Sequence, residues 1–148
     1  MQITRVTEAD LDDLLPLARA YCDFYEVEPS DDALRSFSRI LLEDPARAGV
    51  QLIARDDGGA AIGYATLYWS LSSLSASRIA IMDDLFVQED ARGAGVAEAL
   101  IEECRARSMR QGATTLTWQT AKTNLRAQRV YERVGARRSE WLDYSLET

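Results

Sequence analysis

Arg92-Gly93-Ala94-Gly95-Val96-Ala97 is the stretch of this sequence that decides the fold. It separates an apolar run ending at Val87 from a run of helical periodicity that extends to Gln111. Glycines let consecutive backbone N–H groups converge, a helix N-terminus adds partial positive charge, and the arginine supplies a guanidinium donor. The stretch therefore predicts an anion-binding turn between a strand and a helix, although two glycines before a helix also occur in ordinary tight turns.

A dinucleotide is not the expected anion. The Rossmann pattern needs a third glycine, but position 98 is Glu98. It also needs an acidic residue near the end of the next strand, and the expected strand from Thr114 to Thr120 ends without one.

The run before the turn, Ser77 to Val87, predicts a central strand because it is apolar on both faces except at Asp83 and Asp84. Consecutive strand residues point to opposite faces unless a bulge intervenes. Only one of the two carboxylates is therefore expected to face a ligand.

The remaining periodicities predict one α/β domain, residues 1–148, with the order β-α-α-β-β-β-α-β-α-β and helices on both faces of one mixed sheet. The expected strands are Gln2 to Val6, Val50 to Arg55, Ala61 to Leu71, Ser77 to Val87, Thr114 to Thr120 and Trp141 to Leu146. Three expected helices follow cap signals, at Thr7 with Asp10, at Ser30 and at Asn124, and the fourth runs from Ala94 to Gln111 by its apolar periodicity.

The composition excludes several chemistries. The chain has 148 residues, 47% of them hydrophobic, and no histidine. Without imidazole there is no Ser-His-Asp or Cys-His triad, no histidine phosphotransfer and no histidine zinc site, and we expect no metal. Any general acid or base must be a carboxylate, tyrosine, cysteine, lysine or water.

The cysteines, the N-terminal residues and the net charge limit the expected cellular location and the expected binding partners. Cys22 and Cys104 form no C-x-x-C pair and are expected to be reduced core thiols. The N-terminus is acidic where a signal peptide is basic, and no apolar run approaches about 20 residues, which predicts a soluble cytoplasmic protein. A net charge of -7 disfavours nucleic acid and mildly favours cationic partners.

Two motifs together resemble a known family. The stretch from Arg92 to Ala97 is similar to the R-x-x-G-x-A acyl-CoA loop of the GCN5-related N-acetyltransferases (GNAT), and Asp84 to Val87 resembles that family's central strand. The segment from Asn124 to Ala136 resembles the family's N-x-x-A-x-x-x-Y-E-x-x-G-A motif. The resemblance implies a GNAT fold with a mixed, mostly antiparallel sheet, and it implies an enzyme that uses acetyl-CoA.

Within the family, the pattern most resembles the diamine and polyamine N-acetyltransferases. Those enzymes have Glu-Asp where this chain has Asp83-Asp84, and the side chain at the first position is one methylene shorter here. The resemblance implies amine recognition and leaves the size of the amine open. It also allows a homodimer, although no stretch of the sequence identifies an interface.

The resemblance assigns the cofactor and catalytic residues. It places pantetheine along the strand residues, the pyrophosphate at the turn, and one backbone N–H opposite the thioester oxygen. The acetyl-CoA residues it implies are Leu85, Phe86, Val87, Arg92, Gly93, Ala94, Gly95, Val96, Ala97, Asn124 and Ala127. Tyr131 shares a helical stripe with Asn124 and Ala127, and a phenol protonated at neutral pH suits a general acid for the leaving thiolate. The alternative for Tyr131 is a packing role.

Fewer sequence features indicate which residues bind the amine acceptor. By resemblance Asp83 holds the substrate ammonium and accepts its proton through water, whereas the alternative is a carboxylate bonded to loop donors or paired with Arg78. Phe24 and Tyr25, with Tyr21 and Glu26, are candidates for an acceptor wall, against the alternative of a packed aromatic cluster.

The sequence therefore predicts a direct, sequential acetyl transfer to the primary amine of a small molecule: a diamine, a polyamine or an amino-acid-like compound. Cys104 lies on a helix face expected to be core, which disfavours a thiol intermediate. Two alternatives stay open at this point: acetylation of a protein N-terminus or lysine, and a non-catalytic acyl-CoA-binding module, against which the tyrosine argues.

Overall fold

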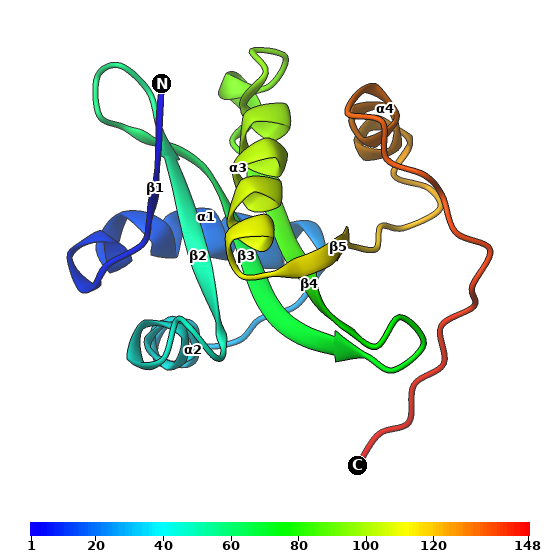
Figure 1. Cartoon of the computed structure of the whole chain (residues 1–148). Helices are drawn as coiled ribbons and strands as arrows, with labels where there is room; N and C mark the ends of the chain where they lie inside the picture. The colour runs from blue at the N-terminus through cyan, green and yellow to red at the C-terminus, as the bar shows by residue number, and fades with distance from the viewer.

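The computed structural model describes residues 1–148 as a five-stranded sheet with helices on both faces (Figure 1). The strands are β1 (Gln2–Arg5), β2 (Gly49–Arg55), β3 (Ala61–Ser72), β4 (Ser77–Val87) and β5 (Ala113–Thr117). The helices are α1 (Leu11–Phe24), α2 (Asp31–Glu43), α3 (Val96–Arg110) and α4 (Leu125–Arg133), with single 3-10 turns η1 (Glu8–Asp10) and η2 (Glu89–Ala91).

The strand order is β1-β2-β3-β4-β5. The first four strands are antiparallel neighbours, and β5 runs parallel to β4 because α3 carries the chain back between them. The predicted mixed, mostly antiparallel sheet is confirmed.

Side-chain caps fix the starts of the helices where the sequence signals lie. The Ser30 hydroxyl accepts a hydrogen bond from the Ala33 amide at 3.1 Å, and the Asn124 side chain accepts one from the Ala127 amide at 3.2 Å. Thr7 and Asp10 form a capping box around η1. None of the helices combines the length and the apolar character that a membrane span requires.

The core has two parts, one on each face of the sheet. On one face α3 covers β2, β3 and β4 through Val96, Leu100, Ile101 and Cys104. On the other face α1 packs Leu11, Leu14 and Leu17 against Ile53 and Tyr64. Burial raises the pKa of the Cys104 thiol to about 12, so this cysteine is the inert core residue that was predicted. Cys22 is only partly buried, which corrects the expectation that both thiols lie in the core.

A β-bulge interrupts β4 at its two acidic residues. Thr66 of β3 pairs with Asp84 and Leu67 pairs with Met82, so Asp83 is the extra residue between them. Asp83 accepts a hydrogen bond from Tyr68, and Asp84 lies opposite Thr66, whose hydroxyl lowers the pKa of the carboxylate. Because Thr66 and Tyr68 are two residues apart on β3, both carboxylates reach the face covered by α1 and α2. The bulge is thus the exception under which two consecutive strand residues need not point to opposite faces.

The predicted last strand is absent. Residues 136–148 follow α4 as irregular chain and add no strand to the sheet (Figure 1). The side chains that suggested a strand are largely exposed: Trp141 81%, Leu142 70%, Tyr144 91% and Leu146 93%. High β-propensity is not sufficient here, because a strand needs a partner and buried neighbours.

Candidate functional site

The site begins where two parallel strands separate. β5 pairs with β4 only at Arg78, Ala80 and Ile81. Beyond Ile81 the same edge of β4 has no strand partner, so it lacks the ladder hydrogen bonds of a paired strand. An extended ligand with amide groups can pair with this edge as a strand would.

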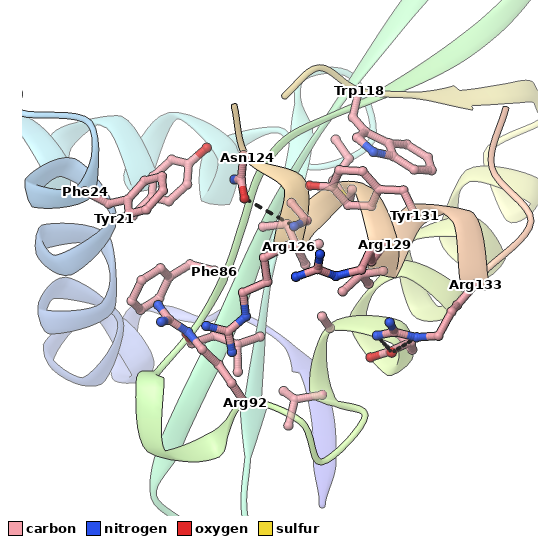
Figure 2. Close-up of a pocket in the computed structure, with 18 of the residues that line it drawn as sticks. Tyr21, Phe24, Phe86, Arg92, Trp118, Asn124, Arg126, Arg129, Tyr131 and Arg133 are labelled. Atoms are coloured by element: carbon pink, nitrogen blue, oxygen red, sulfur yellow. Dashed lines mark hydrogen bonds and ion pairs between the residues drawn. The ribbon is translucent and has the colours of Figure 1, made fainter. Parts of the chain in front are cut away.

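A pocket of about 360 Å³ adjoins that free edge, within the usual size range of small-molecule sites. Its walls come from the C-terminal half of β4, the turn before α3, the start of α3, the chain after β5, one face of α4 and the end of α1 (Figure 2). The pocket thus unites segments that are distant in sequence.

The glycine turn closes one end of the pocket. Gly93 and Gly95 have φ angles of 82° and 80°, a left-handed conformation that side chains with a Cβ disfavour. Gly95 is the N-cap residue of α3, so the first free amides of that helix lie directly after it. Arg92 is held in place by a hydrogen bond from its Nε to the Val87 carbonyl at 2.9 Å. The turn has the free N–H groups and the cation that a phosphate requires.

Arginines of α4 extend this cationic end. Arg126, Arg129 and Arg133 line the pocket together with Arg92, and Figure 2 shows Arg92, Arg126 and Arg129 directed toward one another. Arg133 pairs with Glu98 at 2.6 Å and so joins α4 to α3, whereas Arg126 and Arg129 take part in no ion pair. In a chain of net charge -7 this is a local concentration of available positive charge that favours an anion.

Tyr131 lies in the middle of the pocket wall on α4. Its ring packs edge-on against Trp118, with the ring centroids 5.3 Å apart. Burial of the ring raises the pKa of the Tyr131 hydroxyl above its ordinary value and nearby Tyr25 adds to this, while a hydrogen bond with Thr120 lowers it. The hydroxyl is therefore protonated at neutral pH and is able to donate a proton.

The other end of the pocket is aromatic. Phe24 and Tyr25 at the end of α1 lie edge-on to each other at 5.0 Å, and Tyr21 lies 5.0 Å from Tyr25 and 6.3 Å from Phe86. Phe24 is 59% exposed, so this cluster is a pocket wall more than a packed core. Glu26 is exposed and does not line the pocket, which corrects its expected place in that wall.

Asp83 brings negative charge to this aromatic end. It lines the pocket, and its carboxylate accepts a hydrogen bond from the Tyr68 hydroxyl at 3.0 Å. The Tyr21 hydroxyl reaches the Asp83 carbonyl at 3.4 Å. Arg78 forms no ion pair with Asp83, so the alternative of a structural pair with that arginine is excluded.

Asp84 lies behind the wall and is mostly buried. Burial raises its pKa to about 6, a hydrogen bond from the Thr66 side chain lowers it, and the charge of Asp83 raises it. One exposed and one partly buried carboxylate therefore stand side by side at the bulge. They make this end of the pocket suitable for a cation.

Most of the predicted site residues meet in this one pocket. Ala94 and Gly95 are the exceptions, since both lie outside its lining and Gly95 acts through the backbone of the turn. Residue-by-residue reasoning missed Trp118, Arg126 and Arg129. The two arginines and Arg133 recur at helical spacing beside the stripe of Asn124, Ala127 and Tyr131, a signal that was available in the sequence.

Comparison with known proteins agrees with this geometry. The sequence model of the Acetyltransferase (GNAT) family matches residues 13–136. The chain is 33% identical over 135 residues to YhfO of Bacillus subtilis (strain 168), described as an uncharacterized N-acetyltransferase, covering 91% of this chain and 89% of the relative.

A second relative and a solved structure extend the comparison. The D-amino-acid N-acetyltransferase HPA3 of Saccharomyces cerevisiae is 35% identical over 109 residues, covering 73% of this chain and 66% of the relative. The crystal structure of a probable acetyltransferase superposes with a TM-score of 0.88 at 32% identity, over 100% of this chain and 98% of that one.

Proposed function

The chain belongs to the GNAT family of acetyltransferases and is an acetyl-CoA-dependent N-acetyltransferase; from this premise we propose that it acetylates a primary amine of a small molecule by direct transfer, with Tyr131 as the general acid. The observation that carries the proposal is the single pocket that joins a cationic end, a central phenol and an acidic aromatic end. The three parts match, in order, the anionic cofactor, the leaving thiolate and the amine.

We assign the cationic end to acetyl-CoA. The turn amides and Arg92 suit the pyrophosphate, and Arg126 and Arg129 supply further positive charge for its phosphates. The free edge of β4 from Leu85 to Val87 suits the amides of pantetheine. A backbone N–H there that faces the thioester oxygen would stabilise the developing negative charge, an effect of about 2.7–4 kcal/mol in comparable sites.

The chemical step needs no covalent enzyme intermediate. The ammonium first passes a proton through water to Asp83 and on to solvent. The lone pair of the neutral amine then attacks the thioester carbon, the C–S bond breaks, and the electron pair leaves on sulfur. Tyr131 donates its proton to the thiolate, whose conjugate thiol has an ordinary pKa of about 8.5. The second proton lost from the nitrogen as the amide forms passes through water to the tyrosinate and restores Tyr131. The inert Cys104 is fully buried between α3 and the sheet and does not line the pocket, so it supplies no alternative nucleophile.

The acceptor class follows from the acidic aromatic end. Asp83 is available to hold an ammonium group, and Phe24 and Tyr25 offer ring faces that attract cations. Two adjacent carboxylates favour an acceptor that carries more than one positive charge, so we propose diamines and polyamines ahead of amino-acid-like amines. The similarity to a D-amino-acid N-acetyltransferase makes amino acids the second class to test.

A thiol-release assay with acetyl-CoA tests the proposal. Diamines, polyamines, D- and L-amino acids, aminoglycosides and lysine or N-terminal peptides would be compared by kcat/KM. We expect the highest values for diamines or polyamines. Preference for a peptide would show a protein acetyltransferase, and absence of acceptor-dependent release with every class would show a binding module.

A further inference from the structure

Three polar side chains form a row across the sheet, beneath α1 and α2. Gln51 of β2 pairs in register with Thr66 of β3, and Thr66 pairs with Asp84 of β4. The Gln51 amide donates to the Thr66 hydroxyl at 3.2 Å, and the Thr66 hydroxyl lowers the pKa of its cross-strand neighbour Asp84. The row leads from the interior of the sheet to the residue next to Asp83.

Packing does not account for this row. Gln51 is 5% exposed and Thr66 is fully buried, in a layer made mostly of apolar side chains. The Gln51 carbonyl oxygen has no hydrogen-bond partner at all. A buried unpaired carbonyl costs stability, and an apolar residue at this position would avoid that cost. The amide nitrogen makes its hydrogen bond to Thr66, and that contact points to a role in the row.

The direction of the hydrogen bond from Gln51 to Thr66 indicates what Gln51 does. Because the Thr66 oxygen accepts a hydrogen bond from the Gln51 amide, the hydroxyl hydrogen of Thr66 is free to point at Asp84. A hydroxyl that donates to a carboxylate favours the ionised form. Gln51 thus orients Thr66, and Thr66 orients and stabilises the charged carboxylate.

We propose that Asp84 is a second negative charge of the acceptor site, and that Thr66 and Gln51 are positioning residues that keep it ionised behind Asp83. The inference rests on the proposed function, since it assumes an ammonium group at Asp83. Asp84 acts through its field and not by contact, because the carboxylate lies behind the pocket wall. Buried charges interact over several ångströms more strongly than exposed ones.

The surroundings of Asp84 support a pH-dependent role. The titratable groups that face it are Tyr21 and Cys22 from α1, Tyr64 and Tyr68 from β3, and Asp83 from β4 itself. None of them is a cation that would hold Asp84 ionised at low pH. The pKa of Asp84 is raised to about 6, so the charge is present above that pH and is lost as the pH falls through it.

The test compares the pH dependence of kcat/KM for the best amine of the panel, with acetyl-CoA saturating. The midpoint of the acid limb of this pH profile reports the pKa of Asp84 in the enzyme before the amine binds. A 13C NMR titration of the aspartate carboxyl groups in the free enzyme measures this pKa without requiring activity. Thr66→Val removes the hydrogen bond that lowers the pKa, so the midpoint should move to higher pH. Asp83→Asn removes the charge that raises it, so the midpoint should move to lower pH.

Three further variants separate this role from a structural one. Thr66→Ser keeps the hydroxyl and should restore the wild-type midpoint. Asp84→Asn should abolish the acid limb and raise the acceptor KM about tenfold or more, with the acetyl-CoA KM unchanged. Ser108→Ala removes a hydroxyl that is 3% exposed on the opposite face of the sheet, and should leave the midpoint in place.

The outcomes distinguish the two proposals. Unchanged midpoints in both Thr66→Val and Asp83→Asn, or an unchanged acceptor KM in Asp84→Asn, would overturn the inference. If Thr66→Val does not fold, Asp83→Asn still tests the inference, because Asp83 is exposed and its substitution should still lower the titration midpoint of Asp84. If no amine is acetylated, the proposed function fails, and the NMR midpoints of the variants still test whether the row governs the charge of Asp84.

Discussion

The rings of Tyr131 and Trp118 pack edge to face, with their centroids 5.3 Å apart and their planes inclined by 70°. Trp118 follows the short strand β5, and Tyr131 projects from α4, so the contact joins two walls of the pocket. A phenol held in this way keeps its hydroxyl in one position relative to the free edge of β4. Such fixed geometry is what a general acid requires.

Replacing Tyr131 by Phe should therefore lower kcat by about 100-fold or more, the usual contribution of a positioned acid. The ring and its packing on Trp118 remain, so the KM for acetyl-CoA and the thermal midpoint should change little. Steady-state kinetics with both substrates measures this. Tyr144→Phe, at a tyrosine that is 91% exposed, is the matched control, and an unchanged kcat in Tyr131→Phe would show that the tyrosine only packs.

Arg126 and Arg129 should determine affinity for the cofactor. Changing both to Ala removes two unpaired cations from the pocket, and we expect the Kd for CoA to rise roughly tenfold or more, because hydrogen bonds to charged groups contribute about 1.5–3 kcal/mol. Added salt should weaken the effect. Isothermal titration calorimetry measures the Kd, with Arg105→Ala on the exposed side of α3 as the control; equal effects would refute a specific anion site.

Gly93→Ala tests whether the turn acts through its backbone. A Cβ at Gly93 meets no atom within 4 Å, so the substitution strains the φ angle of 82° without a clash. Gly112→Ala is a close match, with a φ of 74° and equally open space, at the end of α3 away from the pocket. Both should lose about 1–2 kcal/mol of unfolding free energy, and only Gly93→Ala should weaken CoA binding. Equal CoA affinity in the two variants would contradict an anion-binding turn.

The sequence was sufficient for the features whose cause is local. The caps at Ser30 and Asn124 predict helix starts because a side chain bonds to a nearby amide, and both are confirmed. The loop from Arg92 to Ala97 likewise places the turn before α3, although the helix begins at Val96 and not at Ala94. Local hydrogen bonds and glycine conformations depend on only a few consecutive residues, so a short stretch of sequence is enough to predict them.

Features that depend on the register between strands could not be predicted from the sequence. The bulge at Asp83 arises from how β4 pairs with β3, and no residue of β4 alone signals it. The row of Gln51, Thr66 and Asp84 needs three strands in register, so the burial of Asp84 could not be predicted. The residues that follow motifs meet in the pocket, whereas a residue supplied singly by a distant segment, such as Trp118, was missed.

Asp10 links stability to pH. Arg55 of β2 bonds to Asp10 at 2.8 Å and so ties η1 to the sheet. Although partial burial has the opposite effect, hydrogen bonds from Thr7 and Arg55 hold the pKa of Asp10 below its ordinary value. Asp10→Asn should therefore cost about 1–2 kcal/mol at pH 7, with the difference from wild type shrinking as the pH falls below about 4. Chemical unfolding at several pH values, with exposed Asp143→Asn as control, measures this; a difference independent of pH would exclude the ionised carboxylate as the cause.

The C-terminal segment gives the sharpest test of sequence against structure. Trp141 to Leu146 has strand-like composition, yet its large side chains are exposed and its backbone pairs with no strand. The hydrogen bond from Arg138 to Gln128 lies before it, so a chain ending at Glu140 keeps that contact with α4. Removing residues 141–148 should therefore shift the thermal midpoint by no more than about 2 °C, since exposed residues without partners contribute little to the free energy of unfolding. A larger loss, or slow amide exchange across 141–146 in the full chain, would show that these residues do pair as a strand in solution.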